Sequence, residues 1–527
     1  MTVRNKVFVG TFGFAVAVRG MFAYLVSVSM FRNYHRVPGL DMQTLLRFAE
    51  WGGGGPGTAP FFSPHRLLLG LDWLMRGGSH SVWTVFTVQA LLGALGCAAV
   101  ADMMLSFTGK RRGALIAGGI AALYLPTLIY EFSVLQDSFA LNFTLFAVWG
   151  TLTAWKRRFA PVPAALCALL WSLALTGRPT AALCAAAFGG WSLWQLHRRG
   201  LLRRAALPTA LLCVLLGAYS AFNRHNGWNF SPFYQVVQYT RVSNAAPGGP
   251  PATVWQVAFH AAKRSPRLLS AREIPENHNL YFWCEKLPVL HTFPAPGALL
   301  PCAVAATAAL VTAGAYRKRF FWYVFIPILT LALPLCAREA IGRYRLTLTP
   351  YLILAATTGF YAFRRLPVRR KALALLLGGT AAMLSLLDAR SAPRLRAEDY
   401  HAWALAVEAT PGAGKQAILN AFGDYWQETG FRSAKAFRAI VDRALQFRDL
   451  PLSAAIVTQA YRNGISPDLV GYYHGWIFML ADDPAAVERI YSRIDPRRLP
   501  SELRPTYRRV RSDAKKLLHK RATRSIL

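Results

Sequence analysis

Three acidic residues in the first third of the chain are the leading candidates for chemistry. Asp41 opens a helix-like run after the first apolar segment, and Glu131 and Asp137 bracket the polar turn EFSVLQD. Ionisable groups are costly at membrane helices, so they tend to have a function there. Asp41 could act as a general base on an acceptor hydroxyl or amine. Glu131 and Asp137 would add a carboxylate to the same cavity, to orient the acceptor or bind a metal. The structural alternative is that Asp41 and Asp137 only cap helices.

Arginines near the end of the apolar part are the matching candidates for binding an anion. Arg343, Tyr344 and Arg345 form an Arg-Tyr-Arg step before an apolar run, and Arg178 lies in TGRPT between two others. A guanidinium group suits phosphate because its planar fork donates two hydrogen bonds and stays charged. A lipid phosphate lies at headgroup depth, where these residues are expected. The alternative is interfacial snorkelling of the arginine side chains.

The elements that would position these residues are membrane helices. The chain has 527 residues, of which 54% are hydrophobic and only 16% charged, and its mean hydropathy is +0.27. Soluble domains carry about 25% charged residues, and the apolar runs here are long enough to cross a hydrocarbon core of about 30 Å. We therefore predict an all-α, polytopic transmembrane bundle. Its eleven expected spans cover approximately 7–30, 81–107, 113–130, 138–155, 161–175, 180–196, 205–221, 295–316, 320–336, 346–363 and 372–387.

The net charge of +35 indicates membrane topology rather than nucleic-acid binding. Basic clusters lie in short segments between apolar runs, which is the positive-inside pattern and would favour anionic lipid headgroups. No zinc-finger spacing or RNA-binding aromatic signature accompanies them. We expect a multi-pass protein of the inner or plasma membrane with a cytoplasmic N-terminus and an extracytoplasmic C-terminus. The polar stretches with the acids and arginines above then face outside. Arginines in the first outer loop oppose this topology. The clusters are 110–112, 156–158, 198–204, 317–319 and 364–371.

The end of the chain has a different composition. Residues 1–390 would form the catalytic membrane bundle, and residues 391–527 an extracytoplasmic helical domain. Apolar residues recur there at three- and four-residue spacing, and the segment 465–496 is typical of a helix–turn–helix. It is compatible with one degenerate tetratricopeptide unit, but no clean 34-residue period is present. A plain helical cap is the alternative, and the domain is a candidate for binding another protein.

Metal-binding patterns are not evident in the sequence. The seven cysteines are scattered without a CxxC pair, and the chain contains no HExxH motif or clustered His/Asp set. We therefore expect no required cofactor, and leave dependence on a divalent metal open.

The order of the polar motifs resembles the membrane-embedded C-type (GT-C) glycosyltransferases, the superfamily of the protein mannosyltransferases and the aminoarabinose transferase. The resemblance covers residues 1–390. The motifs, in chain order, are GLDMQTLLRFA, APFFSPHRLLLGL, VQALLGALGCAAV, YEFSVLQDSFAL, ALTGRPTAAL, NRHNGWNF, REIPENHNLYFW and RYRLTLTPYL.

This resemblance implies a function and roles for individual residues. The protein would be an inverting glycosyltransferase of the cell envelope that uses a polyprenyl-phosphate-linked sugar as donor. Asp41 would be the catalytic base and Asp137 the second acid, with Arg343 and Arg345 contacting the donor phosphate. The pair of adjacent acids usual in the first loop is reduced here to Asp41. Tyr344, Arg178 and Glu131 remain substrate-binding candidates from their positions alone.

Two alternatives from other classes remain. A non-catalytic lipid-linked-glycan flippase, transporter or scaffold should show internal repeats and polar residues in mid-span, and the two halves of this chain show no similarity. A lipid-linked glycan ligase or polymerase would instead depend on a His or Arg in the long loop 222–294.

Overall fold

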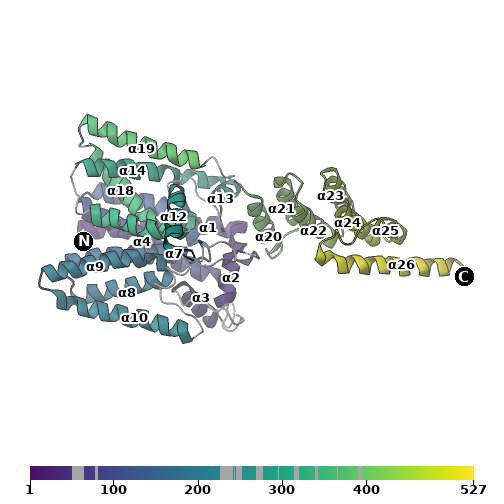
Figure 1. Cartoon of the computed structure of the whole chain (residues 1–527), viewed down its shortest axis with the longest axis horizontal. Helices are drawn as coiled ribbons and strands as arrows, with labels where there is room; N and C mark the ends of the chain where they lie inside the picture. Colours follow the sequence, from purple (N-terminus) through teal and green to yellow (C-terminus); the bar gives the residue numbers. More distant parts are fainter. Residues whose placement is uncertain are drawn as a thin grey trace. The chain divides into compact units, whose positions relative to one another are not determined.

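All regular elements in the described part of the chain are helices, which confirms the all-α prediction. Two compact units form, one from Met1–Ser29 with Gly39–Arg394 and one from Met30–Pro38 with Leu395–Leu527. Figure 1 shows the helices of both units. The computed structural model describes residues 1–38, 40–49, 64–76, 81–225, 241, 244, 252–268, 277–294, 296–313, 320–338, 342–364, 366–389 and 395–526.

The first unit is a bundle of apolar helices, and each of the eleven predicted ranges holds one. Among the residues that the structure describes, four helical stretches are long and apolar enough to cross a membrane, and α5 with α6 forms a fifth if this pair, bent by 52°, is one span. The chain is thus a polytopic membrane protein, and the number eleven stays a prediction. The helices are α1 (Val3–Val28), α4 (Val82–Thr108), α5 (Arg111–Leu123), α6 (Leu125–Glu131), α7 (Asp137–Lys156), α8 (Pro161–Gly177), α9 (Ala182–Arg198), α10 (Ala206–His225), α14 (Pro296–Ala313), α16 (Ile326–Arg338), α18 (Thr349–Arg364) and α19 (Val368–Ala389), with a π-helical turn, η5 (Phe321–Phe325), before α16.

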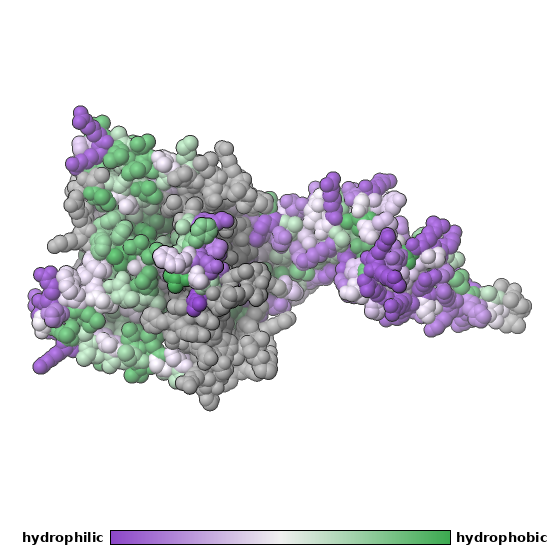
Figure 2. Space-filling view, in the orientation of Figure 1, coloured by the Kyte–Doolittle hydropathy of each residue, from purple (hydrophilic) through white to green (hydrophobic). Residues whose placement is uncertain are grey.

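The surface of this bundle is apolar. Figure 2 shows hydrophobic side chains over its face, with hydrophilic groups at the edge where Figure 1 places the N-terminus. An apolar surface this extensive is typical of contact with lipid, since monomeric soluble proteins rarely expose large contiguous apolar patches. Its exposed members include Leu166, Leu207, Val214, Phe360, Leu375 and Leu376.

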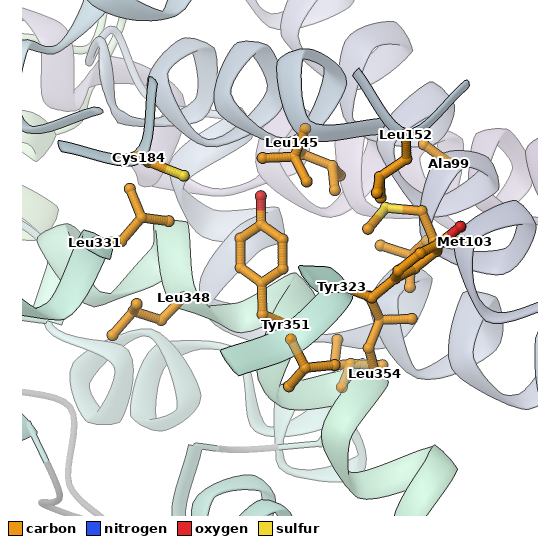
Figure 3. Close-up of a cluster of buried hydrophobic side chains, with 14 of the residues drawn as sticks. Ala99, Met103, Leu145, Leu152, Cys184, Tyr323, Leu331, Leu348, Tyr351 and Leu354 are labelled. Atoms are coloured by element: carbon orange, nitrogen blue, oxygen red, sulfur yellow. The ribbon is translucent and has the colours of Figure 1, made fainter. Parts of the chain in front are cut away.

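The interior of the bundle is close-packed around Tyr351, near the start of α18. Tyr351 is fully buried, and Figure 3 shows its ring among Leu145, Leu331, Leu348 and Cys184. These neighbours come from four other elements, so the beginning of α18 is fixed against most of the bundle. This packing also fixes the backbone just beyond the Arg-Tyr-Arg step.

Buried charges in the bundle are paired. Asp102 of α4 is 2% exposed and accepts hydrogen bonds from Arg4 Nη2 at 2.6 Å and Trp149 Nε1 at 2.8 Å. A charge inside the membrane is tolerated only with such partners. The network joins α1, α4 and α7.

Short helices between the long ones carry the polar segments. Each has too few residues to cross a bilayer, because a helix rises only about 1.5 Å per residue. One of these helices, α3, contains the mostly apolar run RLLLGLDWLM, which is too short to cross a bilayer. The elements are α2 (Asp41–Ala49), α3 (Pro64–Met75), α12 (Val254–Leu268), α13 (Leu280–Lys286), η4 (Pro288–Thr292), α17 (Gly342–Arg345) and η6 (Leu346–Leu348).

The second unit is also helical, and it includes the predicted helix–turn–helix as α24 and α25. It takes in η1, because Asn33 Nδ2 donates to Thr410 Oγ1 at 2.6 Å and Phe31 packs edge-on against Trp403. A repeat of tetratricopeptide type stays a prediction. The elements are η1 (Met30–Arg36), α20 (Ala397–Glu408), α21 (Lys415–Glu428), α22 (Ala434–Gln446), α23 (Leu450–Arg462), α24 (Pro467–Leu480), α25 (Pro484–Tyr491), η7 (Ser501–Leu503) and α26 (Arg504–Ile526).

Replacing Gly475 with Ala should destabilise the pairing of α24 with α25. A Cβ at this position would lie 1.9 Å from Cε1 of Tyr491, a fully buried ring. Overpacking of this kind costs about 1–3 kcal/mol. Amide hydrogen exchange of α24 and α25 in the full-length protein would measure the loss.

The matched control is Gly423→Ala in α21, where the nearest atom, Ile440 Cδ1, would be 3.7 Å away. This change should be neutral or stabilising, because Ala forms helix better than Gly by up to about 1 kcal/mol. If the amides of α24 and α25 are equally protected from hydrogen exchange in the two variants, the packing described for Gly475 is wrong.

Candidate active site

Asp41 is held by two residues far from it in the sequence. Arg343 Nη1 donates to Asp41 Oδ2 at 2.8 Å across 302 positions, and Asn277 Nδ2 donates to the same oxygen at 2.9 Å. The backbone N–H of Asp41 in turn donates to Asn277 Oδ1 at 3.3 Å. Within the described residues the carboxylate makes no hydrogen bond to its own helix, so its side chain does not cap α2 there.

One carboxylate oxygen of Asp41 is available for chemistry. Both donors bind Oδ2, and in the described part of the chain nothing binds Oδ1; the side chain is 52% exposed. Burial alone would raise the pKa of Asp41, but the hydrogen bonds from Asn277 and Arg343 and the charge of Arg343 outweigh it. The pKa is therefore below its ordinary value, and Asp41 is ionised at neutral pH.

Arg343 leads from Asp41 to a second ion pair. Its Nη2 donates to Tyr344 Oη at 3.2 Å, and its guanidinium carbon lies 5.0 Å from the Tyr344 ring centroid. The guanidinium of Arg178 lies 4.2 Å from the same centroid and forms a buried ion pair with Asp137. Five residues predicted from four separate segments thus form one cluster, and Tyr344 is the link between the two ion pairs.

Arg178 and Asp137 each lie at a helix end whose partial charge favours the charge of the side chain. Asp137 is the first residue of α7, where the partial positive charge of the helix favours a carboxylate. Arg178 ends α8, with its N–H donating to Ala174 O at 2.9 Å, and a cation is favoured at that end. Both side chains are buried, at 2% and 8% exposure, so each neutralises the other's charge.

The structure does not bring Glu131 to this cluster. Glu131 is completely buried and accepts a 2.7 Å hydrogen bond from Arg19 Nη2 of α1. Gly93 leaves the space for it, since a Cβ there would lie 1.8 Å from Glu131 Oε1. A residue in this position ties α1 to α6, and it does not share the exposed surface of Asp41.

Arg345 follows Arg343 and Tyr344 in α17 and is partly exposed. The hydrogen bonds and ion pairs described above do not include it. Its predicted contact with a donor phosphate stays a prediction.

Two residues of the site had no role assigned from the sequence. Asn277 contacts Asp41 directly. His278 next to it is 3% exposed, edge-on to Tyr130 and to Trp283; burial, and then the charge of Arg343, lower the pKa of His278 to about 3. His278 is therefore neutral beside the cluster. Both lie in IPENHN, a motif used for the resemblance, which was the available signal.

Metal ligands do not cluster in the described residues. No group of three or more His, Cys, Asp or Glu side chains there could hold an ion.

Comparison with known proteins gives one weak likeness. No family model matches the chain, and no curated protein matches it. The structure is similar to the crystal structure of ArnT from Cupriavidus metallidurans bound to undecaprenyl phosphate, with a TM-score of 0.40 and 15% sequence identity, over 92% of this chain and 81% of that one. A likeness this distant does not identify the chemistry of this chain.

Replacing Arg178 with Ala should strongly destabilise the bundle. The substitution leaves the Asp137 carboxylate buried without its cation, and breaking a buried pair costs about 3–5 kcal/mol. Adding Asp137→Asn should recover part of the loss, because the remaining side chain is then uncharged. Thermal unfolding of the purified protein in detergent would measure both effects.

Arg199→Ala is the control, because Arg199 is exposed at the end of α9. Changes at such surface positions usually stay within about 0.5 kcal/mol. If Arg178→Ala unfolds at the same temperature as this control, the ion pair with Asp137 does not stabilise the bundle.

Proposed function

We propose that the protein is an integral-membrane glycosyltransferase that moves a sugar from a polyprenyl-phosphate-linked donor to an acceptor on the outer face of the membrane. The observation that supports this proposal is the ion pair between Asp41 and Arg343. A carboxylate whose side chain is 52% exposed lies 2.8 Å from a guanidinium group that is only 11% exposed. The donor class and the side of the membrane follow the sequence resemblance and the predicted topology.

The proposed reaction uses the two residues for different tasks. Arg343 binds the phosphate of the donor, with Tyr344 holding the guanidinium. Oδ1 of Asp41 takes the proton of an acceptor hydroxyl or amine as the acceptor attacks the anomeric carbon from the side opposite the phosphate. The bond between that carbon and the phosphate oxygen breaks, the lipid phosphate leaves as an anion, and the configuration inverts. No general acid is required, since the leaving group is already a stable anion.

Donor binding would also strengthen the base. A phosphate competes with Asp41 for Arg343, because both are anions that accept charge-assisted hydrogen bonds. Losing the cation removes two of the contributions that lower the pKa of Asp41, so the carboxylate becomes more basic as the donor arrives. Asp137, which stays buried with Arg178, would hold that second guanidinium against Tyr344.

A transporter of lipid-linked glycans is the second candidate. The buried pair of Arg19 and Glu131 favours it, because ionisable residues inside a bundle often mark a transport path. The two side chains are 2% and 0% exposed and bound to each other, whereas Asp41 is half exposed. The arrangement supports an enzyme acting at the surface over a path through the interior.

Asp41→Asn should reduce sugar transfer by roughly 10²–10⁴-fold, the usual contribution of a general base. The amide keeps the size of the side chain but cannot take the proton. The measurement is transfer in membranes supplied with a polyprenyl-phosphate sugar, with Glu285→Gln as control. Glu285 is a partly exposed carboxylate in α13 that pairs with Lys286, and its loss should leave transfer unchanged. Transfer at the wild-type rate in Asp41→Asn would refute the mechanism.

Arg343→Ala should raise the donor KM by about tenfold or more, which corresponds to about 1.4 kcal/mol of lost binding. The donor KM of Arg343→Lys should lie between those of the wild type and Arg343→Ala, because lysine keeps the charge but lacks the planar fork. Steady-state kinetics with varied donor concentration would measure both variants. A loss of thermal stability with unchanged donor KM would count against phosphate binding.

A further inference from the structure

We propose that Asn277 is a positioning residue that keeps Asp41 oriented while Arg343 is engaged by the donor phosphate. This inference rests on the proposed function and deepens it. It assigns a task to a residue in the long loop, 236 positions from Asp41 in the sequence.

Asn277 makes two contacts with Asp41, one to the backbone and one to the side chain. Its Oδ1 accepts from the Asp41 N–H at 3.3 Å, and its Nδ2 donates to Asp41 Oδ2 at 2.9 Å. A carboxylate held at one oxygen while its own backbone is bound to the same amide has little freedom to rotate. Both donors bind Oδ2, so Oδ1 is left for the acceptor.

The second donor to Oδ2 differs from Asn277 in charge. Arg343 is a cation and is the natural partner for an arriving phosphate. The Asn277 amide is neutral and attracts a phosphate much less. When the phosphate takes Arg343, Asn277 therefore remains as the hydrogen-bond donor to Asp41. Without Asn277, an Asp41 side chain that is 52% exposed would lose its orientation when the base is needed.

The backbone around Asn277 is anchored well enough for this task. His278 is buried between Tyr130 and Trp283. Asn279 caps α13, with its Oδ1 accepting from the Tyr281 N–H at 3.0 Å. An amide carried by such a segment can orient a partner across the site.

The alternative is that Asn277 only tethers the loop to α2, and the pH dependence separates the two roles. The hydrogen bond from Asn277 favours the ionised form of Asp41, so its loss must raise the pKa of that carboxyl. The other charged group that contacts Asp41 in the described residues is Arg343. Arg178 and Asp137 lie beyond Tyr344, and His278 is buried and neutral. A tether that acts only through the backbone N–H of Asp41 would leave the pKa of its carboxyl unchanged.

The experiment compares Asn277→Ala with Asn279→Ala in the full-length protein in lipid nanodiscs. With Asn277→Ala, kcat should fall by about tenfold or more at saturating donor, with donor KM within twofold, and the acidic limb of the pH profile should move to higher pH. Asn277→Asp should move it further, because a second carboxylate opposes ionisation of Asp41. Asn279→Ala disturbs the same loop without touching Asp41 and should leave the pH profile unchanged.

A second measurement reads Asp41 without turnover. Labelling of its carboxyl by a water-soluble carbodiimide, followed by mass spectrometry across pH, should show a higher midpoint in Asn277→Ala than in the wild type. An unchanged midpoint, or an equal shift in Asn279→Ala, would overturn the role of Asn277. If the midpoint shifts while Asp41→Asn retains full transfer, the contact stands and the proposed function fails.

Discussion

The ion pair between Asp41 and Arg343 is the interaction on which the arrangement of the site depends. It joins α2, after the first span, to α17, before the last two long helices. Other contacts fix both ends. Tyr351 packs the start of α18 into the bundle, and at the C-terminus of α16 the carbonyl of Ala337 accepts from Asn244 Nδ2 at 2.8 Å. The short helix α17 is thus held between two anchored elements, and Arg343 has a defined position.

Burial separates this pair from three ion pairs that join helices of the bundle. The acidic partners Asp102, Glu131 and Asp137 are between 0% and 2% exposed, whereas Asp41 is 52% exposed. A buried pair contributes little net stability but is costly to break, which suits residues that join helices. An exposed carboxylate gains little from its pair and can exchange partners at low cost. Similar residue types therefore serve structure in one place and are suited to chemistry in another.

Much of this site could be predicted from the sequence because its residues are charged or aromatic and lie near the ends of apolar runs. Asp41, Asp137, Arg178, Arg343 and Tyr344 were singled out in this way, and the structure brings them together. Glu131 looked equivalent to Asp137 in the same turn. The partner of Glu131, Arg19, lies 112 positions away in the sequence. The residues around Glu131 do not show which way its side chain faces. Asn277 was missed for a related reason: its motif contributed to the resemblance, but a neutral amide in a polar loop has no evident role until its partner is known. The inclusion of η1 in the C-terminal unit likewise depends on contacts between distant residues, such as Asn33 with Thr410.

A neutral resting cluster also bears on which anions the site would accept. Two guanidinium groups and two carboxylates balance one another around Tyr344. A bare arginine at headgroup depth would bind any anionic phospholipid, because such surfaces attract cations without selectivity. With Asp41 already on Arg343, a phosphate must displace a carboxylate before it binds. A ligand that offers only a phosphate gains little from that exchange, whereas one with a sugar and a long lipid can add contacts that offset it. If the site binds its donor as proposed, competition by an internal carboxylate would discriminate against ordinary headgroups, which is specificity achieved by opposing the wrong partner.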